Sequence, residues 1–211
     1  MSTPPEPASV LPEIRDTQAL GLSSGQPFLT FITPTYRRPR RLASCLESVS
    51  SQSGVSGVEH LVLPDHVGVG IDGMYARLPR YAEAVHGEYV HVLADDDVLA
   101  DCGAVEALRE VARAKGMPPV LIVDVVKHME PGPLRLPLDG ARVAELGPIE
   151  GRIDLGCLVV RADVWKAHVH QYGRRYAGDF DFAAALWSAG HPFTYAGVMF
   201  LFGAVMRGRP E

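Results

Sequence analysis

Three consecutive carboxylates, Asp95, Asp96 and Asp97, are the residues whose type and spacing point most directly to chemistry. They follow Tyr89–Leu93, a short and mostly apolar run that predicts a buried strand. Adjacent carboxylates repel one another, and Mg²⁺ or Mn²⁺, which prefers carboxylate oxygens, removes that repulsion. The alternative is an acidic turn before a helix, where the helix dipole favours Asp. The pattern therefore leaves a metal site and a structural turn both open.

A second acidic pair, Asp179 and Asp181, lies in the run GDFDF. This run opens a predicted helix that continues to Gly190. Residues two apart point in different directions on a helix, so one carboxylate can reach a site while the other caps the helix. A carboxylate in a site can take a proton as a general base. The structural alternative is that both acids only favour the helix N-terminus.

A basic turn, Thr35–Arg41, follows the first predicted strand, Phe28–Thr33, and the Pro34 that closes it. Pro39 suits the first turn of a helix, whose buried face we assign to the apolar positions at helical spacing: Leu42, Cys45, Leu46 and Val49. The end of a strand and the start of a helix form a natural anion site. The alternative is a solvated basic face.

A second predicted strand, Glu59–Leu63, ends at Pro64-Asp65. The order strand, helix, strand with short connections predicts a parallel pair of strands. Ligands of open α/β sheets bind at the carboxyl ends of such strands. Asp65 is therefore a candidate to accept hydrogen bonds from a base or a ribose.

The stretch Gly68–Gly73, GVGIDG, matches the glycine pattern of dinucleotide-binding loops. That interpretation requires a helix that opens within the motif, with an acid about 20 residues further on. Pro79 interrupts such a helix, and we predict a helix from Pro79 to His86 instead. We therefore interpret the glycines as a mobile connection and keep dinucleotide binding as the alternative.

The remaining elements alternate between strand and helix. An irregular stretch, His128–Arg152, interrupts them and is assigned to acceptor recognition. The other expected elements are a helix capped by Asp101 and ended by Gly116, a strand at Pro119–Val126, a strand at Leu155–Val160, a helix at Arg161–His170, and strand or helix at Phe193–Tyr195 and Val198–Phe202.

The composition, with 47% hydrophobic and 21% charged residues and a net charge of −5, is that of an ordinary soluble protein without a global basic field for nucleic acid. Cys45, Cys102 and Cys157 form no CxxC pair, which argues for a reducing compartment. No signal pattern is present, and the longest apolar run, Val198–Met206, is too short to span a bilayer. We expect a cytoplasmic protein with one domain at 27–206, a flexible tail at 1–26 and a short tail at 207–211.

Three blocks of the sequence, in this order, resemble family 2-type glycosyltransferases of the GT-A fold. They are FITPTYRRPRRLASCLESVSSQ, GEYVHVLADDDVL and GDFDFAAALWSAGHPFTY. The resemblance implies an α/β fold: a single GT-A-type, Rossmann-like domain with a mostly parallel central sheet flanked by helices. The sequence departs from the family pattern at Arg37, where Asn is usual, and at Ala94, where Asp is usual. It also lacks the usual second acid beside Asp65 and has no late histidine beyond His191.

The resemblance also implies inverting transfer of a sugar from a nucleotide-diphosphate donor, most often a UDP-sugar, with Mn²⁺ or Mg²⁺ as the cofactor. The residues it assigns to the donor, extended here by two positions of the basic turn, are Pro34, Thr35, Tyr36, Arg38, Asp65, Asp95 and Asp96. Asp96 and Asp97 would hold the metal, and Asp179, or failing that Asp181, would be the catalytic base.

The acceptor stays open between a glycan, a lipid-linked glycan, a protein and a modified nucleic-acid base. Three other functions also stay open. A nucleotidyltransferase would use a similar acidic metal site, an oxidoreductase would bind NAD(P) through GVGIDG, and a non-catalytic module would bind a nucleotide sugar without turnover.

Overall fold

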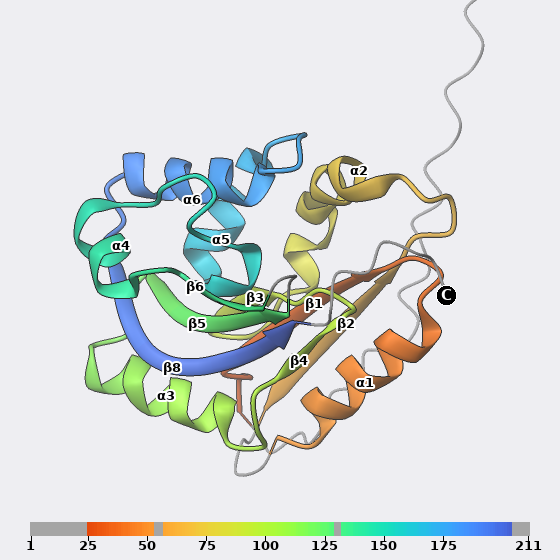
Figure 1. Cartoon of the computed structure of the whole chain (residues 1–211), viewed down its shortest axis with the longest axis horizontal. Coiled ribbons are helices and arrows are strands. Elements are labelled where there is room, and N and C mark those ends of the chain that lie inside the picture. Colours follow the sequence, from red (N-terminus) through yellow and green to blue (C-terminus); the bar gives the residue numbers. More distant parts are fainter. Residues whose placement is uncertain (1–24, 53–56, 129–131, 204–211) are drawn as a thin grey trace, which may run out of the picture.

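One curved eight-stranded sheet organises the described residues, 25–52, 57–128 and 132–203, of the computed structural model (Figure 1). The strands follow the order β2-β1-β3-β7-β5-β8-β4, and β6 pairs with β5 outside this path. Helices α1 and α3 lie on one side of the sheet, and α2, α5 and α6 lie on the other (Figure 1). The predicted α/β domain, with one sheet flanked by helices, is confirmed.

The strands are β1 (Leu29–Thr35), β2 (Val58–Pro64), β3 (Tyr89–Val92), β4 (Asp97–Leu99), β5 (Val120–His128), β6 (Pro133–Leu136), β7 (Leu158–Arg161) and β8 (Phe193–Gly203). The α-helices are α1 (Pro39–Ser50), α2 (Gly70–Arg77), α3 (Ala104–Ala114), α4 (Gly140–Leu146), α5 (Ala162–His168) and α6 (Gly178–Ser188). Short 3₁₀ segments are η1 (Leu78–Ala84), η2 (Leu155–Cys157) and η3 (Val169–Gln171).

Strands β1 and β2 form the predicted parallel pair, and β3 pairs parallel with β1 on its other side. Phe31 and Ile32 of β1 are fully buried, as expected of a strand covered on both faces. Thr35 at the end of β1 pairs in register with Pro64 at the end of β2. The carboxyl ends of these strands therefore meet at one edge of the sheet, where the candidate site residues follow them.

The sheet is more mixed than predicted. Within the described residues, β1, β2, β3, β5 and β8 point one way, and β4, β6 and β7 point the other. Strand β4 begins at Asp97, where the chain has turned back after the acidic run, so it pairs antiparallel with β8. The two apolar runs near the C-terminus, left open between strand and helix, form the single strand β8.

The prediction for the glycine-rich stretch is wrong. Helix α2 begins inside it at Gly70, and the expected helix from Pro79 to His86 is instead the 3₁₀ segment η1. Pro79 lies at the start of η1, where its missing N–H breaks no helical hydrogen bond. A proline near the start of a new turn does not exclude a helix just before it.

The other predicted helices form at α1, α3, α5 and α6. On α1 the buried face is narrower than predicted, because Cys45 and Val49 are buried whereas Leu46 is exposed. Gly116 ends the α3 segment with a φ of +74°, a value that glycine adopts without strain.

The stretch His128–Arg152 contains β6 and α4 in place of the irregular chain predicted there, with 129–131 outside the described residues. Strand β6 is fixed to the sheet by Asp124, a buried residue of β5. Its Oδ2 accepts hydrogen bonds from Arg135 at 2.6 Å and from the Tyr195 hydroxyl at 2.8 Å. This anchor fixes β6, whose last residue, Leu136, lines the candidate site.

Of the predicted N-terminal tail, 1–26, only residues 25 and 26 are described, and the predicted C-terminal tail, 207–211, lies outside the described residues. Over the described parts of the chain, no helix is both long enough and apolar enough to cross a membrane.

Candidate functional site

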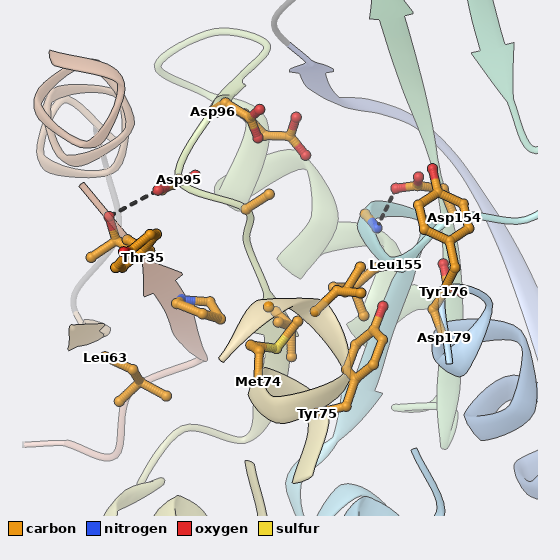
Figure 2. A pocket seen from close by; sticks show the side chains of 18 of the residues that line it. Thr35, Leu63, Met74, Tyr75, Asp95, Asp96, Asp154, Leu155, Tyr176 and Asp179 are labelled. Carbon is orange, nitrogen blue, oxygen red and sulfur yellow. Dashed lines mark hydrogen bonds between the residues drawn. The ribbon is translucent and has the colours of Figure 1, made fainter. Parts of the chain in front are cut away.

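A cavity of about 680 Å³ opens at the carboxyl ends of β1, β2 and β3 (Figure 2). The first wall of the cavity comprises the lining residues within 34–38, 63–65 and 94–97. The second wall comprises residue 136 and the lining residues within 151–156 and 176–180. Helix α2 lies between the walls and contributes Met74 and Tyr75 (Figure 2). The lining includes every predicted site residue except Asp181.

Asp95 is buried on the first wall, and both of its carboxylate oxygens accept hydrogen bonds. Thr35 Oγ1 donates to Oδ2 at 2.8 Å (Figure 2), and Arg38 Nη1 donates to Oδ1 at 3.1 Å. The basic turn after β1 is thereby fixed to the acidic run after β3. The predicted proximity of these two segments follows from the parallel pairing of their strands.

Asp96 lies beside two arginines. Arg41 Nη1 is 3.1 Å and Arg38 Nη1 is 3.4 Å from Asp96 Oδ2. Because both guanidinium groups approach the same oxygen, Oδ1 of Asp96 is left without a partner among the described residues. Asp96 Oδ1 can therefore accept a ligand while Oδ2 keeps its contacts with the two arginines.

Asp97 forms an ion pair with a lysine that the sequence analysis did not assign to the site. Lys127 Nζ is 2.9 Å from Asp97 Oδ2 and 3.2 Å from Asp154 Oδ1, so one ammonium joins carboxylates from two parts of the chain. Burial alone would lower the pKa of Lys127, but the charges of Asp154 and Asp97 outweigh burial and raise the pKa above its usual value. The lysine therefore stays charged at neutral pH.

The acidic run does not form a closed metal cage. Within the described residues, no group of three or more His, Cys, Asp or Glu side chains gathers around a point that could hold a metal ion. An open site with one free carboxylate oxygen, such as Asp96 Oδ1, still fits Mg²⁺, which in proteins is commonly bound by one or two carboxylates together with substrate phosphates and waters. The predicted ligand Asp97 has both oxygens in contact with Lys127.

Asp65 holds the loop that follows β2. Its carboxylate accepts hydrogen bonds from the backbone N–H groups of Val67 at 3.0 Å and Val69 at 2.6 Å, and from Arg77 Nη1 at 3.1 Å. Burial raises the pKa of Asp65, but these hydrogen bonds outweigh it and lower the pKa below its usual value. The loop amides thus point to a carboxylate of this chain, whereas a dinucleotide-binding loop directs such groups to a pyrophosphate.

Tyr36 covers this loop from the first wall. A Cβ added at Gly68 would lie 2.7 Å from the Tyr36 ring, and Gly68 has a φ of +80°. Both facts require glycine here, so Gly68 serves close packing against Tyr36. The Arg37 guanidinium lies 5.1 Å from the centroid of the same ring.

Asp179, at the first turn of α6, is the predicted base, and it lines the second wall. Figure 2 shows it on the side of the cavity opposite Thr35 and Asp95. Burial raises the pKa of Asp179 to about 6, with a smaller contribution from the charge of Asp154. No ion pair of Asp179 occurs among the described residues, and the Phe180 N–H donates to its Oδ1 at 2.8 Å.

Asp181 does not line the cavity, although it lies on the same turn of α6. Its carboxylate accepts hydrogen bonds from Arg175 Nε at 2.8 Å and from Arg175 Nη2 at 2.5 Å. Arg175 also contacts Glu150 Oε1 at 2.7 Å. The two acids of the GDFDF run thus point in different directions, as their spacing indicated, and only Asp179 reaches the cavity.

No protein-family model matches the chain, and no curated protein matches it in sequence. Solved structures of S. aureus TarS do match it. One TarS structure has a TM-score of 0.60 at 13% identity and covers 84% of this chain and 36% of TarS.

TarS residues 1–349 in complex with UDP match with a TM-score of 0.59 at 13% identity, covering 84% of this chain and 60% of that one. The complex of the same fragment with UDP-GlcNAc matches with a TM-score of 0.57 at 12% identity, covering 86% and 60%. This chain therefore spans less than two thirds of these TarS structures.

The likeness shows that the chain shares its fold with TarS, a glycosyltransferase. The fold expected from the sequence is thus supported by a comparison that does not depend on the acidic and basic motifs.

Sequence reasoning missed Lys127 and Asp154. A signal for Lys127 was available, because a lone cation directly follows the predicted strand Pro119–Val126, as the acidic run follows its own strand. Asp154 had no such signal. Asp154 comes before β7 in the chain and does not follow a predicted strand. It lies at this edge of the sheet because β7 runs antiparallel to β3 and β5.

Proposed function

We propose that this protein is a family 2-type glycosyltransferase that transfers a sugar from a nucleotide-diphosphate donor to an acceptor hydroxyl. The observation that carries the proposal is the arrangement of carboxylates in one cavity. Asp95 and Asp96 lie beside arginines on the first wall, and Asp179 has a raised pKa on the second. The likeness to TarS, which is solved with UDP and UDP-GlcNAc, supports a UDP-sugar as the donor.

The first wall supplies the groups for the donor. The Arg38 side chain is 44% exposed and lines the cavity, so it can bind diphosphate oxygens while it contacts Asp95. Pro34, Thr35 and Tyr36 would flank the nucleoside. Asp65 would position the loop that borders the nucleoside, since its carboxylate already binds that loop.

Asp96 is the residue we propose to hold a Mg²⁺ or Mn²⁺ ion, whereas Asp97, the second predicted ligand, has both oxygens in contact with Lys127. Oδ1 of Asp96 can accept such a ligand while Arg38 and Arg41 hold Oδ2 in place. When bound, the cation would neutralise the charge of the departing diphosphate. The two arginines place further positive charge on the same side of the cavity.

Asp179 is the proposed general base. A pKa of about 6 leaves it ionised at neutral pH, and it binds a proton more tightly than an ordinary aspartate. In this proposal the acceptor hydroxyl gives its proton to Asp179 and attacks the anomeric carbon, while the bond from that carbon to the diphosphate oxygen breaks and the nucleoside diphosphate leaves. The attack comes from the wall opposite the diphosphate and therefore inverts that carbon.

The variant Asp179→Asn tests the proposal, since Asn has nearly the same shape but cannot take the proton. We expect transfer to fall by about 10²–10⁴-fold, the usual contribution of a general base. The KM for the donor should change less than about twofold, because the donor binds the other wall. Release of UDP from UDP-GlcNAc and UDP-glucose with Mn²⁺ measures both, and pyrophosphate release would identify a nucleotidyltransferase instead.

The matched control is Asp163→Asn, an aspartate on the surface of α5 that pairs with Arg161 and does not line the cavity. It should retain the activity of the unmodified protein. Equal losses of turnover and of donor affinity in Asp179→Asn would contradict the role of Asp179 as a base.

A further inference from the structure

An exposed aromatic side chain lies on the second wall beside the proposed base. Tyr176 is 75% exposed and lines the cavity, three residues before Asp179. Figure 2 shows it on the same side of the cavity as Asp154 and Asp179, opposite Thr35. The ring is thus presented to the space that an acceptor of Asp179 must occupy.

The backbone that carries Tyr176 is held on both sides. The Gly173 N–H donates to Gly178 O at 3.3 Å, and the Gly178 N–H donates to Arg175 O at 2.9 Å. A Cβ at Gly178 would lie 2.2 Å from the Gly173 carbonyl oxygen, so the close approach requires glycine. The Arg175 side chain adds the contacts to Asp181 and Glu150. These contacts hold the backbone on both sides of Tyr176, whose side chain is exposed.

The second wall also differs in charge from the first. Its ionisable lining residues, apart from Tyr176, are Asp154 and Asp179, both acidic. Arg175 does not line the cavity, because its guanidinium is turned to Glu150 and Asp181. Asp154 is paired with Lys127, so the unpaired Asp179 is the charge that would repel an anionic group here, whereas a neutral polyhydroxylated group would meet carboxylate acceptors and an aromatic face.

We infer that Tyr176 is the binding platform for a neutral sugar ring of the acceptor, so that the acceptor is a saccharide. The C–H face of a pyranose would pack on the Tyr176 ring, which offers a large, rigid contact area. One hydroxyl of that ring would then point to Asp179. This inference rests on the proposed function and names the acceptor class for the same site.

Saccharide binding tests the inference without requiring turnover. The probes are methyl β-glucoside, methyl β-galactoside and methyl β-N-acetylglucosaminide, added to the full chain with UDP and Mn²⁺ and followed by saturation-transfer NMR. We expect at least one probe to bind, Tyr176→Ala to lose that signal, and Tyr176→Phe to keep it because the ring is retained. Leu146→Ala, which removes an exposed apolar side chain outside the cavity, is the matched control and should bind as the unmodified chain does.

Kinetics with the best probe give the second readout. Tyr176→Ala should raise the acceptor KM by about tenfold, the upper range for one aromatic contact, and the donor KM by less than twofold. Binding of glycerol 3-phosphate in place of the saccharides, or equal binding by the Ala variant and the unmodified chain, would overturn the inference. A protein that binds the saccharide through Tyr176 but releases no UDP would contradict the proposed function alone.

Discussion

Asp95 and Asp96 on the first wall of the cavity and Asp179 on the second are the same residue type in opposite electrostatic surroundings. On the first wall, Asp95 and Asp96 lie 3.1 Å from the arginines of the basic turn. On the second wall, Asp179 has no ion pair among the described residues, and burial raises its pKa to about 6. Aspartates with a cation partner suit the binding of a charged ligand, whereas an unpaired, half-buried aspartate such as Asp179 suits the uptake of a proton.

The difference comes from neighbours that are distant in sequence. Arg38 is 57 residues from Asp95, and Lys127 is 30 residues from Asp97. Lys127 also joins the two walls, because it contacts Asp97 on the first and Asp154 on the second.

The largest effect is expected for Lys127→Met, which leaves Asp97 and Asp154 without their cation. Asp97 is 3% exposed and burial already raises its pKa to about 6, so without the lysine it must stay buried as an unpaired charge or take up a proton, and either costs stability. Removing one partner of a buried ion pair costs about 3–5 kcal/mol, which corresponds to a factor of 10² or more in the unfolding equilibrium. Urea unfolding followed by circular dichroism measures this loss.

The variant Lys127→Arg keeps the charge and is the matched control. It should lose clearly less stability than Lys127→Met. Equal losses in both variants would mean that side-chain packing, and not the charge between Asp97 and Asp154, is what the lysine provides.

The first wall is tested by Asp96→Asn, which keeps the shape and removes the negative charge. We expect kcat/KM for UDP-sugar turnover to fall on the order of 100-fold and the stimulation by Mn²⁺ to disappear. Titration of Mn²⁺ against UDP release gives both values. Asp72→Asn, which removes an exposed acid of α2 outside the cavity, should keep the Mn²⁺ dependence, and an unchanged dependence in Asp96→Asn would locate the metal elsewhere.

The pH profile tests the second wall. A base must be ionised, so kcat should fall about tenfold per pH unit below a pKa near 6 and level off above it. The contribution of Asp179 to the free energy of unfolding changes with pH in the opposite direction. The native state keeps the Asp179 proton between its ordinary pKa of 3.8 and about 6, so the contribution of Asp179 to the free energy of unfolding decreases as the pH rises through that range.

Steady-state rates with saturating donor between pH 4.5 and 8 measure the profile. The first wall, where the donor is proposed to bind, serves as an internal comparison, because the affinity for UDP can be followed over the same pH range. A fall in kcat centred near pH 4 would mean that an ordinary, solvated carboxylate, and not Asp179, is the general base.

The site could be predicted from the sequence where a site residue directly follows the strand that positions it. The runs before Thr35, Asp65 and Asp95 have the apolar pattern that predicts buried strands. Because these strands run parallel, their carboxyl ends meet at one edge of the sheet. Their meeting in one cavity could therefore be predicted from short segments. The unlike orientation of Asp179 and Asp181 followed from helical spacing alone.

The rest depended on contacts between distant segments. The pairing of Lys127 with Asp154 requires the antiparallel direction of β7, which no local pattern encodes. Helix α2 could not be predicted, because a proline after it suggests that no helix forms there. In the structure Pro79 begins a new 3₁₀ turn after α2. Tyr176 carried no signal, because only the fold shows that its exposed ring faces the cavity.

The smallest effect is expected for Asp181→Asn, which separates the two acids of α6. Asp181 pairs with Arg175 near the surface and lies outside the cavity, so its loss should lower kcat by less than about threefold, as expected of an exposed ion pair. The same change at Asp179 should cost at least about a hundredfold. Parallel assays of the two Asn variants at saturating acceptor measure the ratio. Equal losses would show that the roles of these two aspartates do not follow from which of them faces the second wall.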